Sequence, residues 1–205
     1  MGKRPLVRRR GRGGMQFRAA KTRKIAPTKY PVFELSESRE GQIIDIIHES
    51  GRNAPLSKIR FDDGTISYVP AVIGSTVGSK VKFGLKSEIM DGNVISIQNI
   101  PDGTVVCNVE KQFGDGGSFI KSAGSSATVF SHGDEGVKLK LPSGKFTTLN
   151  PKNRAMIGSL AGGGANDRPL MRAGVKWRKF RSRGQKYPIV RGVAQASYVH
   201  PHGGG

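Results

Sequence analysis

Positive charge at the two ends of the chain, with few acids beside it, is the feature that most limits how this sequence can fold. The chain of 205 residues contains 34 Lys and Arg but 15 Asp and Glu, which gives a formal net charge of +19. Residues 1–40 contribute +9 and residues 171–205 contribute +8, whereas residues 41–100 are neutral overall. Because neither end can bury enough apolar surface to offset its lost entropy, we expect both to be disordered alone and to order against a polyanion.

Nucleic acid is a better candidate for that polyanion than membrane lipid. No apolar run approaches the ~20 residues that span a bilayer, and the basic stretches lack the regular apolar face of an interfacial helix. The first fourteen residues contain cations but no apolar run, unlike a secretory signal. Cys107 is the only cysteine, which excludes an intramolecular disulfide or a cysteine-based zinc site and fits a reducing compartment.

The middle of the chain predicts two groups of short strands. Asp62-Asp63-Gly64 is a hairpin signal, because Asp-Gly accepts the positive φ of tight turns. A second turn, Pro101-Asp102-Gly103, separates the groups. The mainly β pattern favours two small barrels over one continuous sandwich, and we expect no long amphipathic helix, with at most two short turns over residues 169–177. The expected strands cover residues 42–48, 56–61, 65–69, 80–83 and 94–100, then 104–109, 127–131, 137–141, 145–149 and 154–160.

The C-terminal segment combines cations with aromatic rings. Its cations can neutralise phosphates and release counterions, while Trp177, Phe180 and Tyr187 offer faces on which unstacked bases can lie. A merely solvated tail, the alternative, would contain more Ser and Glu and fewer rings. We predict nucleic-acid binding by Arg172, Lys176, Trp177, Arg178, Lys179, Arg181, Arg183, Lys186 and Arg191.

An arginine-glycine run at residues 8–14 predicts a second nucleic-acid-binding segment. Its glycines allow the backbone to approach phosphates closely. A localisation signal or a solubilising tail is the alternative. The candidate residues near this end are Arg8, Arg9, Arg10, Arg12, Arg18, Arg23 and Lys24.

The sequence contains no arrangement typical of catalysis. The glycine-rich residues 114–117 and 162–164 do not continue as Gly-Lys-Ser/Thr, so they favour turns over a nucleotide-hydrolysing site. His200 and His202 cannot complete a zinc site by themselves, and no Ser-His-Asp or paired-carboxylate pattern is evident. We expect both histidines to stack on, or hydrogen-bond to, nucleic acid, with a catalytic His200 as the weaker alternative.

Several segments together resemble the L2 family of large-subunit ribosomal proteins, in its archaeal or eukaryotic branch. They fall in the family's order and spacing over about residues 41–205. The matching segments are GRNAPLSKIRFDDG (51–64), NIPDGTVVCNVE (99–110), GDGGSFIKSAGSSA (114–127), VKLKLPSGKF (137–146), NRAMIG (153–158), VRGVA (190–194) and HPHGGG (200–205). Family members usually continue past the three glycines with a further basic tail.

The resemblance implies four parts. They are a basic RNA-threading arm (1–39), an OB-fold barrel (40–100), an SH3-like barrel (101–172) and an extended basic segment (173–205) that ends in HPHGGG. It implies a structural constituent of the large ribosomal subunit, not an enzyme, that binds 23S-type ribosomal RNA near the peptidyl-transferase centre and supports subunit association and tRNA positioning. A free-standing RNA chaperone or translation factor is the alternative.

The resemblance also implies partners and individual residues. The partners are ribosomal RNA, neighbouring ribosomal proteins and the small subunit, in the cytoplasmic ribosome, with no membrane and no small-molecule substrate. No cofactor is expected apart from Mg²⁺ that accompanies ribosomal RNA. Arg52 and Lys121 match RNA-binding positions, and Lys121 would bind phosphate as a point charge, since the family often has Arg there. Arg154 is a further RNA-binding candidate.

The terminal motif departs from the family at two positions. Ala196 and Val199 stand where Asn and Asp are usual. Because that Asp could orient the His200 ring, its replacement weakens a proton-transfer role for His200.

Overall fold

The computed structural model describes residues 4–31, 38–84 and 87–205. The chain divides into two compact units. Residues 25–168 form one, here called the β unit, and residues 1–24 with 169–205 form the other, here called the terminal unit.

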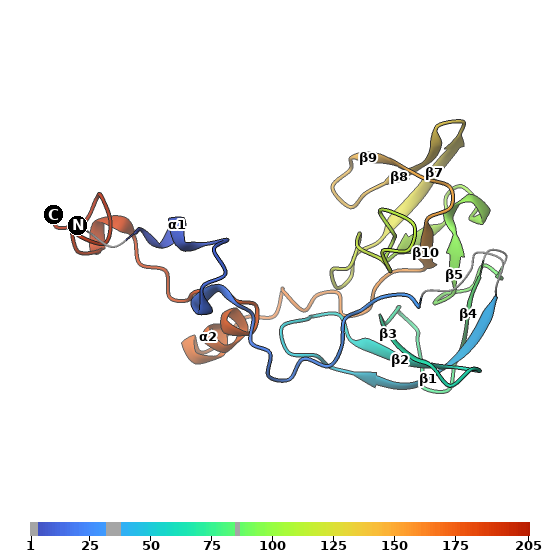
Figure 1. The fold of residues 1–205 in the computed structure, drawn as a ribbon, viewed down its shortest axis with the longest axis horizontal. Helices are drawn as coiled ribbons and strands as arrows, with labels where there is room; N and C mark the ends of the chain where they lie inside the picture. Colours follow the sequence, from blue (N-terminus) through green and yellow to red (C-terminus); the bar gives the residue numbers. More distant parts are fainter. Residues whose placement is uncertain (1–3, 32–37, 85–86) are drawn as a thin grey trace. The chain divides into compact units, whose positions relative to one another are not determined.

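A single sheet builds the β unit (Figure 1). Among the described residues it has ten strands in the order β3-β2-β1-β4-β5-β10-β6-β7-β8-β9, and neighbours are antiparallel except for the β4–β5 pair. The strands are β1 Arg39–Ile47, β2 Leu56–Phe61, β3 Ile66–Pro70, β4 Lys80–Phe83, β5 Val94–Ser96, β6 Val105–Cys107, β7 Ala127–Gly133, β8 Gly136–Lys140, β9 Phe146–Leu149 and β10 Arg154–Ile157. The predicted mainly β fold is confirmed.

The central strands β5, β10 and β6 bury side chains in two separate cores. Successive residues of a strand point to opposite sides of the sheet. Val94 and Met156 therefore join one core while Ile95 and Ala155 join the other. The first core takes its other side chains mainly from β1 to β4 and the second mainly from β6 to β9. The sheet is continuous and not closed, with β3 and β9 as its outer strands, so closed barrels are not confirmed.

Three predicted strands are clearly shorter than expected, for local reasons. The strand expected over 104–109 is β6 (Val105–Cys107), and Asn108 after it has a φ of +46°. The strand expected over residues 94–100 ends at Ser96, and the 3-10 helix η2 (Ile97–Asn99) follows. Ile97 and Ile100 are spaced by one helical turn rather than by two residues, and the Ile100 N–H donates to the Ile97 carbonyl. The strand expected over 154–160 ends at Ile157, because Gly158 has a φ of +100° that leaves the extended region.

The terminal unit contains helices that the sequence did not predict. Its elements are α1 (Leu6–Arg9), η1 (Met15–Phe17), α2 (Ala173–Ser182) and η3 (Gly192–Ala194). The prediction that residues 173–205 are extended is wrong for the ten residues of α2. Lys, Arg and Ala are good helix formers even without an apolar stripe.

Gly184 ends α2 in a defined way. Its φ of +69° lies in the left-handed region, its N–H donates to the Arg181 carbonyl at 3.1 Å, and the Gln185 N–H donates to the Phe180 carbonyl at 2.9 Å. This is the Schellman pattern, which satisfies carbonyls that the helix leaves unpaired.

Candidate nucleic-acid interface

The cations of the terminal unit lie on a scaffold without a buried core. Among residues 4–24 and 169–205, none whose side chain is described is buried. The predicted binding residues divide into two groups. The exposed ones are Arg8, Arg10, Arg12, Arg18, Arg23, Lys24, Arg172, Lys176, Trp177, Arg178, Arg181, Arg191 and His202. The partly exposed ones are Arg9, Lys179, Arg183, Lys186 and His200.

The aromatic rings of the terminal unit are accompanied by cations of the same unit. The Arg181 guanidinium lies 4.9 Å from the Trp177 ring centre, one helical turn away on α2. The Lys176 ammonium lies 5.1 Å from the Tyr187 ring, and Tyr187 also packs against Phe180. These cation–π contacts place positive charge at the ring faces, so a base that stacks there would bring its phosphate close to a cation.

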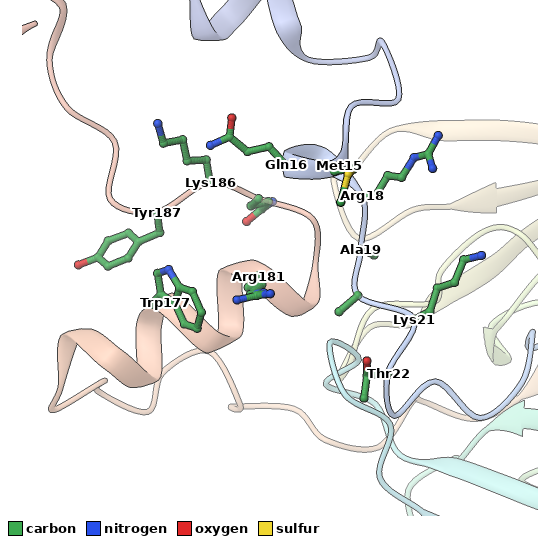
Figure 2. A pocket seen from close by; sticks show the side chains of 12 residues that line it. Met15, Gln16, Arg18, Ala19, Lys21, Thr22, Trp177, Arg181, Lys186 and Tyr187 are labelled. Carbon is green, nitrogen blue, oxygen red and sulfur yellow. The ribbon is translucent and has the colours of Figure 1, made fainter.

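A cavity of about 920 Å³ lies beside these rings within the terminal unit (Figure 2). Residues of both terminal segments line the cavity, so the N-terminal cations Arg18 and Lys21 lie next to α2. The lining comprises Met15, Gln16, Arg18, Ala19, Ala20, Lys21, Thr22, Trp177, Arg181, Gln185, Lys186 and Tyr187.

The HPHGGG motif folds back on the VRGVA segment. The Gly204 N–H donates to the Gln195 carbonyl at 3.1 Å, and the His202 N–H donates to Nδ1 of His200 at 3.1 Å. A Cβ at Gly192 would overlap the His200 ring, so a larger residue there would displace the ring. The backbone of the motif therefore orients the His200 ring through Nδ1.

Arg52 and Lys121 lie in the β unit and converge on Thr28. Arg52 Nη1 donates to Thr28 Oγ1 at 3.0 Å, while Lys121 Nζ donates to the Thr28 carbonyl at 3.0 Å and to the Gly117 carbonyl at 2.8 Å. Burial lowers the pKa of the Lys121 ammonium, and the neighbouring Arg52 charge lowers it further. The structure thus brings together the two positions selected by resemblance, and their RNA binding stays a prediction.

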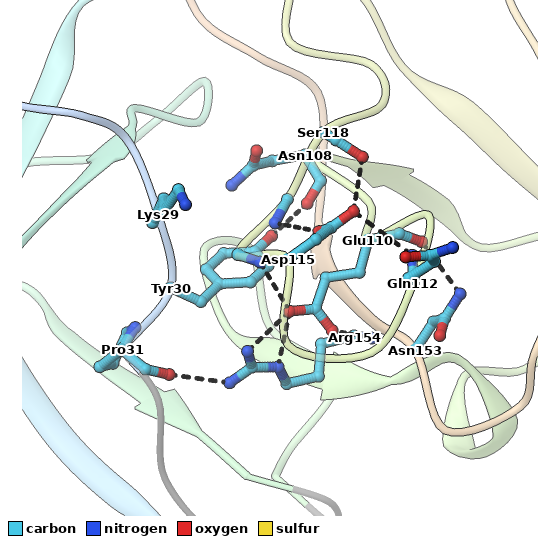
Figure 3. A network of polar contacts seen from close by, with 12 residues as sticks. Lys29, Tyr30, Pro31, Asn108, Glu110, Gln112, Asp115, Ser118, Asn153 and Arg154 are labelled. Carbon is cyan, nitrogen blue, oxygen red and sulfur yellow. Dashed lines mark hydrogen bonds and ion pairs between the residues drawn. The ribbon is translucent and has the colours of Figure 1, made fainter.

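Unlike the other candidates, Arg154 lies in a buried network of polar contacts (Figure 3). Glu110 Oε1 accepts from Arg154 Nη2 at 2.6 Å and from Nε at 3.1 Å, and Arg154 Nη1 donates to the Pro31 carbonyl at 3.0 Å. Arg154 is 6% exposed and Glu110 is fully buried. The guanidinium also lies over the Tyr30 ring. We therefore assign Arg154 to the core and do not keep it among the RNA-binding residues.

Asp115 is a structural position that sequence reasoning missed. Burial raises the pKa of its carboxyl, but hydrogen bonds from Ser118 Oγ and from the backbone N–H groups of Gly117, Lys111 and Gln112 outweigh that effect, so the pKa is lowered. The carboxylate holds the glycine-rich turn at residues 114–117, which is consistent with a turn rather than a phosphate loop. The sequence signal for this turn was an acid directly before two glycines, both of which have a positive φ in the structure.

The described part of the chain offers no grouping of three His, Cys, Asp or Glu side chains suited to a metal ion. Within the same residues, no helix has the length and apolar character needed to cross a membrane.

Comparison with known proteins agrees with the resemblance seen in the sequence. The family Ribosomal Proteins L2, C-terminal domain, matches residues 90–205. The chain is 76% identical over 205 residues to Large ribosomal subunit protein uL2 of Cenarchaeum symbiosum (strain A), across 100% of this chain and 84% of that protein. Identity is 72% over 206 residues to uL2 of Nitrosopumilus maritimus (strain SCM1), with the same coverage. It is 43% over 205 residues to uL2 of Sulfolobus acidocaldarius, across 100% of this chain and 85% of that protein. The chain therefore belongs to the uL2 family of large ribosomal subunit proteins.

Proposed function

We propose that this protein is a structural constituent of the large ribosomal subunit and binds its ribosomal RNA. One observation carries the proposal. The terminal unit combines many cations with no buried side chain among those described. Such a unit lacks the hydrophobic burial that offsets conformational entropy. RNA phosphates would supply both the missing counter-charge and the missing packing surface.

The cations of α2 suit phosphate neutralisation. Arg178 and Arg181 can each form paired hydrogen bonds to one phosphate, whereas Lys176 and Lys179 act as point charges. Each contact releases condensed counterions from the RNA, which makes binding favourable at low salt and weak at high salt. The Trp177 ring, exposed beside Arg181, adds a face for an unstacked base.

The β unit would contribute a second RNA surface through Arg52 and Lys121. Lys29 lies close enough to affect the Lys121 pKa and is exposed, so it joins Arg52 and Lys121 near Thr28, where Arg52 also pairs with Glu49 at 3.5 Å. We further propose that the two cores correspond to an OB-fold-like part (40–100) and an SH3-like part (101–172). The arms at residues 1–39 and 173–205 would thread between RNA helices. The two separate hydrophobic cores support two parts, with Ile95, Ile97 and Ile100 packing into the second core from the end of the first part.

Family membership supports the wider role. We propose that the protein helps to organise RNA near the peptidyl-transferase centre, supports subunit association and helps to position tRNA, with neighbouring ribosomal proteins and the small subunit as further partners in the cytoplasmic ribosome. The relatives are named as ribosomal proteins, so we assign the chain a structural role and no enzymatic one.

The salt dependence of RNA binding tests the proposal. Affinity of the full chain for large-subunit ribosomal RNA is measured over a range of salt concentrations, for the wild type and for a variant with Lys176, Arg178, Lys179 and Arg181 replaced by Gln. We expect the slope of log affinity against log salt to shrink by about 0.7–0.9 for each phosphate that the variant no longer neutralises.

A control variant replaces Lys80 and Lys82 by Gln, and its slope is compared for each charge removed. These two lysines pair with Glu40 and Glu88, so their replacement should leave the slope unchanged. Binding that does not depend on salt, or equal slopes for both variants, would contradict the proposal. A protein found mostly free of large particles when cell extract is sedimented would instead favour the RNA chaperone.

A further inference from the structure

Two phenylalanines lie exposed on the sheet of the β unit. Phe130 on β7 and Phe146 on β9 are 56% and 53% exposed. Their rings meet edge to face with centres 4.8 Å apart. Apolar rings of this size are usually buried in a folded protein, so an exposed pair marks a surface that can bind something.

The backbone directs both rings to the outer side of the sheet. The register of the β7–β8 pair shifts between Val129 and Ser131, which makes Phe130 the extra residue of a β-bulge. A bulge changes the direction of a side chain relative to the regular ladder. Val129 is buried on the inner side, and Phe130 is exposed on the outer side.

Lysines accompany the two rings on the same side. Lys140 lies directly opposite Phe146 in the β8–β9 pair, and Lys138 and Lys140 alternate with the buried Val137 and Leu139 along β8. Residues 136–152 contain four lysines and no acid. We call Phe130, Phe146, Lys138 and Lys140 the Phe-Lys face.

We infer that the Phe-Lys face binds unstacked nucleotides of ribosomal RNA. A base stacks on an aromatic ring whatever its identity, and lysines beside the ring bind the adjoining phosphates. A protein partner fits less well, because lysine is depleted in the buried part of protein interfaces. The inference rests on the proposed function and adds to it a contact surface in the β unit that neither Arg52 nor Lys121 belongs to.

Paired substitutions test whether the rings stack on bases. Phe130→Leu with Phe146→Leu keeps apolar volume but removes both rings, and should weaken binding of the full chain to large-subunit ribosomal RNA by about tenfold. Phe130→Tyr with Phe146→Tyr keeps both rings and should bind like the wild type. Lys138→Gln with Lys140→Gln should reduce the salt slope by about 0.7 for each lysine.

Controls separate this inference from the proposed function and from misfolding. Ile66→Ala removes an exposed apolar side chain at the opposite outer strand, β3, and should leave RNA affinity unchanged. Circular dichroism should show all variants folded, since both rings are exposed. A wild type that fails to bind ribosomal RNA would overturn the proposed function as well.

Two results would contradict RNA binding by the Phe-Lys face without contradicting the proposed function. One is a Leu variant that binds RNA as tightly as the wild type. The other comes from a photo-crosslinking residue at position 130 in assembled large subunits. Cross-links to ribosomal RNA support the inference, whereas cross-links to a ribosomal protein alone assign the face to a protein partner.

Discussion

The role of each arginine in this chain depends on what surrounds its guanidinium. Arg181 is exposed and lies over the Trp177 ring, whereas Arg154 is buried and bonded to Glu110 through two nitrogens. A buried charge is costly to remove from water and is tolerated only with a partner. The Glu110–Arg154 ion pair therefore makes each residue dependent on the other, and Arg154 also holds the Pro31 carbonyl.

Replacement of Glu110 tests this dependence at the residue scale. Glu110→Gln leaves the Arg154 guanidinium buried without a counter-charge and should lower the free energy of unfolding by about 3 kcal/mol. Urea denaturation of the full chain, followed by circular dichroism, measures the change. Glu135→Gln, at an exposed turn residue, should change stability by less than about 0.5 kcal/mol. Equal effects of the two substitutions would show that the ion pair does not stabilise the fold.

The stability of helix α2 depends on its C-terminal end more than on a buried face. No residue of α2 is buried, so packing contributes little to its stability. Its C-terminal end has Lys179 and Arg181, which interact favourably with the helix dipole. Gly184 then closes the helix, and a Cβ there would lie 2.7 Å from the Ala19 backbone nitrogen. The end of α2 therefore packs closely against the N-terminal segment within the terminal unit.

Two glycine substitutions test this account at the scale of the element. Gly184→Ala would force an L side chain into a positive φ and against Ala19, and should destabilise the end of α2 by about 1 kcal/mol or more. Gly174→Ala meets nothing within 4 Å and should stabilise the helix by up to about 1 kcal/mol. Amide hydrogen exchange at Gln185, on the RNA-bound protein, measures both. Faster exchange in both variants, or in neither, would contradict the role assigned to Gly184.

The whole molecule combines two units that are stabilised differently. The β unit contains two hydrophobic cores and a buried ion pair. The terminal unit has neither burial among its described side chains nor acids to balance residues 171–205. The first should therefore be stable alone, while the second should depend on the polyanion that it binds.

Limited proteolysis of the full chain tests that difference. Without RNA, trypsin should cut first within residues 4–24 and 169–205 and leave a resistant fragment close to residues 25–168. Addition of large-subunit ribosomal RNA should protect both terminal segments, and high salt should remove the protection because it weakens phosphate contacts. Mass spectrometry of the fragments identifies the sites. Terminal segments that resist trypsin in nuclease-treated protein would contradict the prediction.

Local patterns were enough to predict most strands and the segregation of charge. The Asp-Gly turn at residues 63–64 and the alternation at residues 137–141 identify hairpin strands, since a turn preference and a period of two depend only on neighbouring residues. The sequence did not predict helix α2, because a helix is normally recognised by an apolar stripe and the stability of α2 does not come from one.

The sequence alone determined the charge of the two ends, the likeness of the chain to the uL2 family and the approximate positions of most strands. The tertiary structure decided that β10 joins the two groups of strands into one sheet and that Arg154 is buried. It also decided that Arg52 and Lys121 meet at Thr28. These facts depend on pairs of residues far apart in the chain, such as Glu110 with Arg154. An arginine in a sequence looks the same whether phosphate or a buried carboxylate will neutralise it, and only the folded backbone determines which of them it can reach.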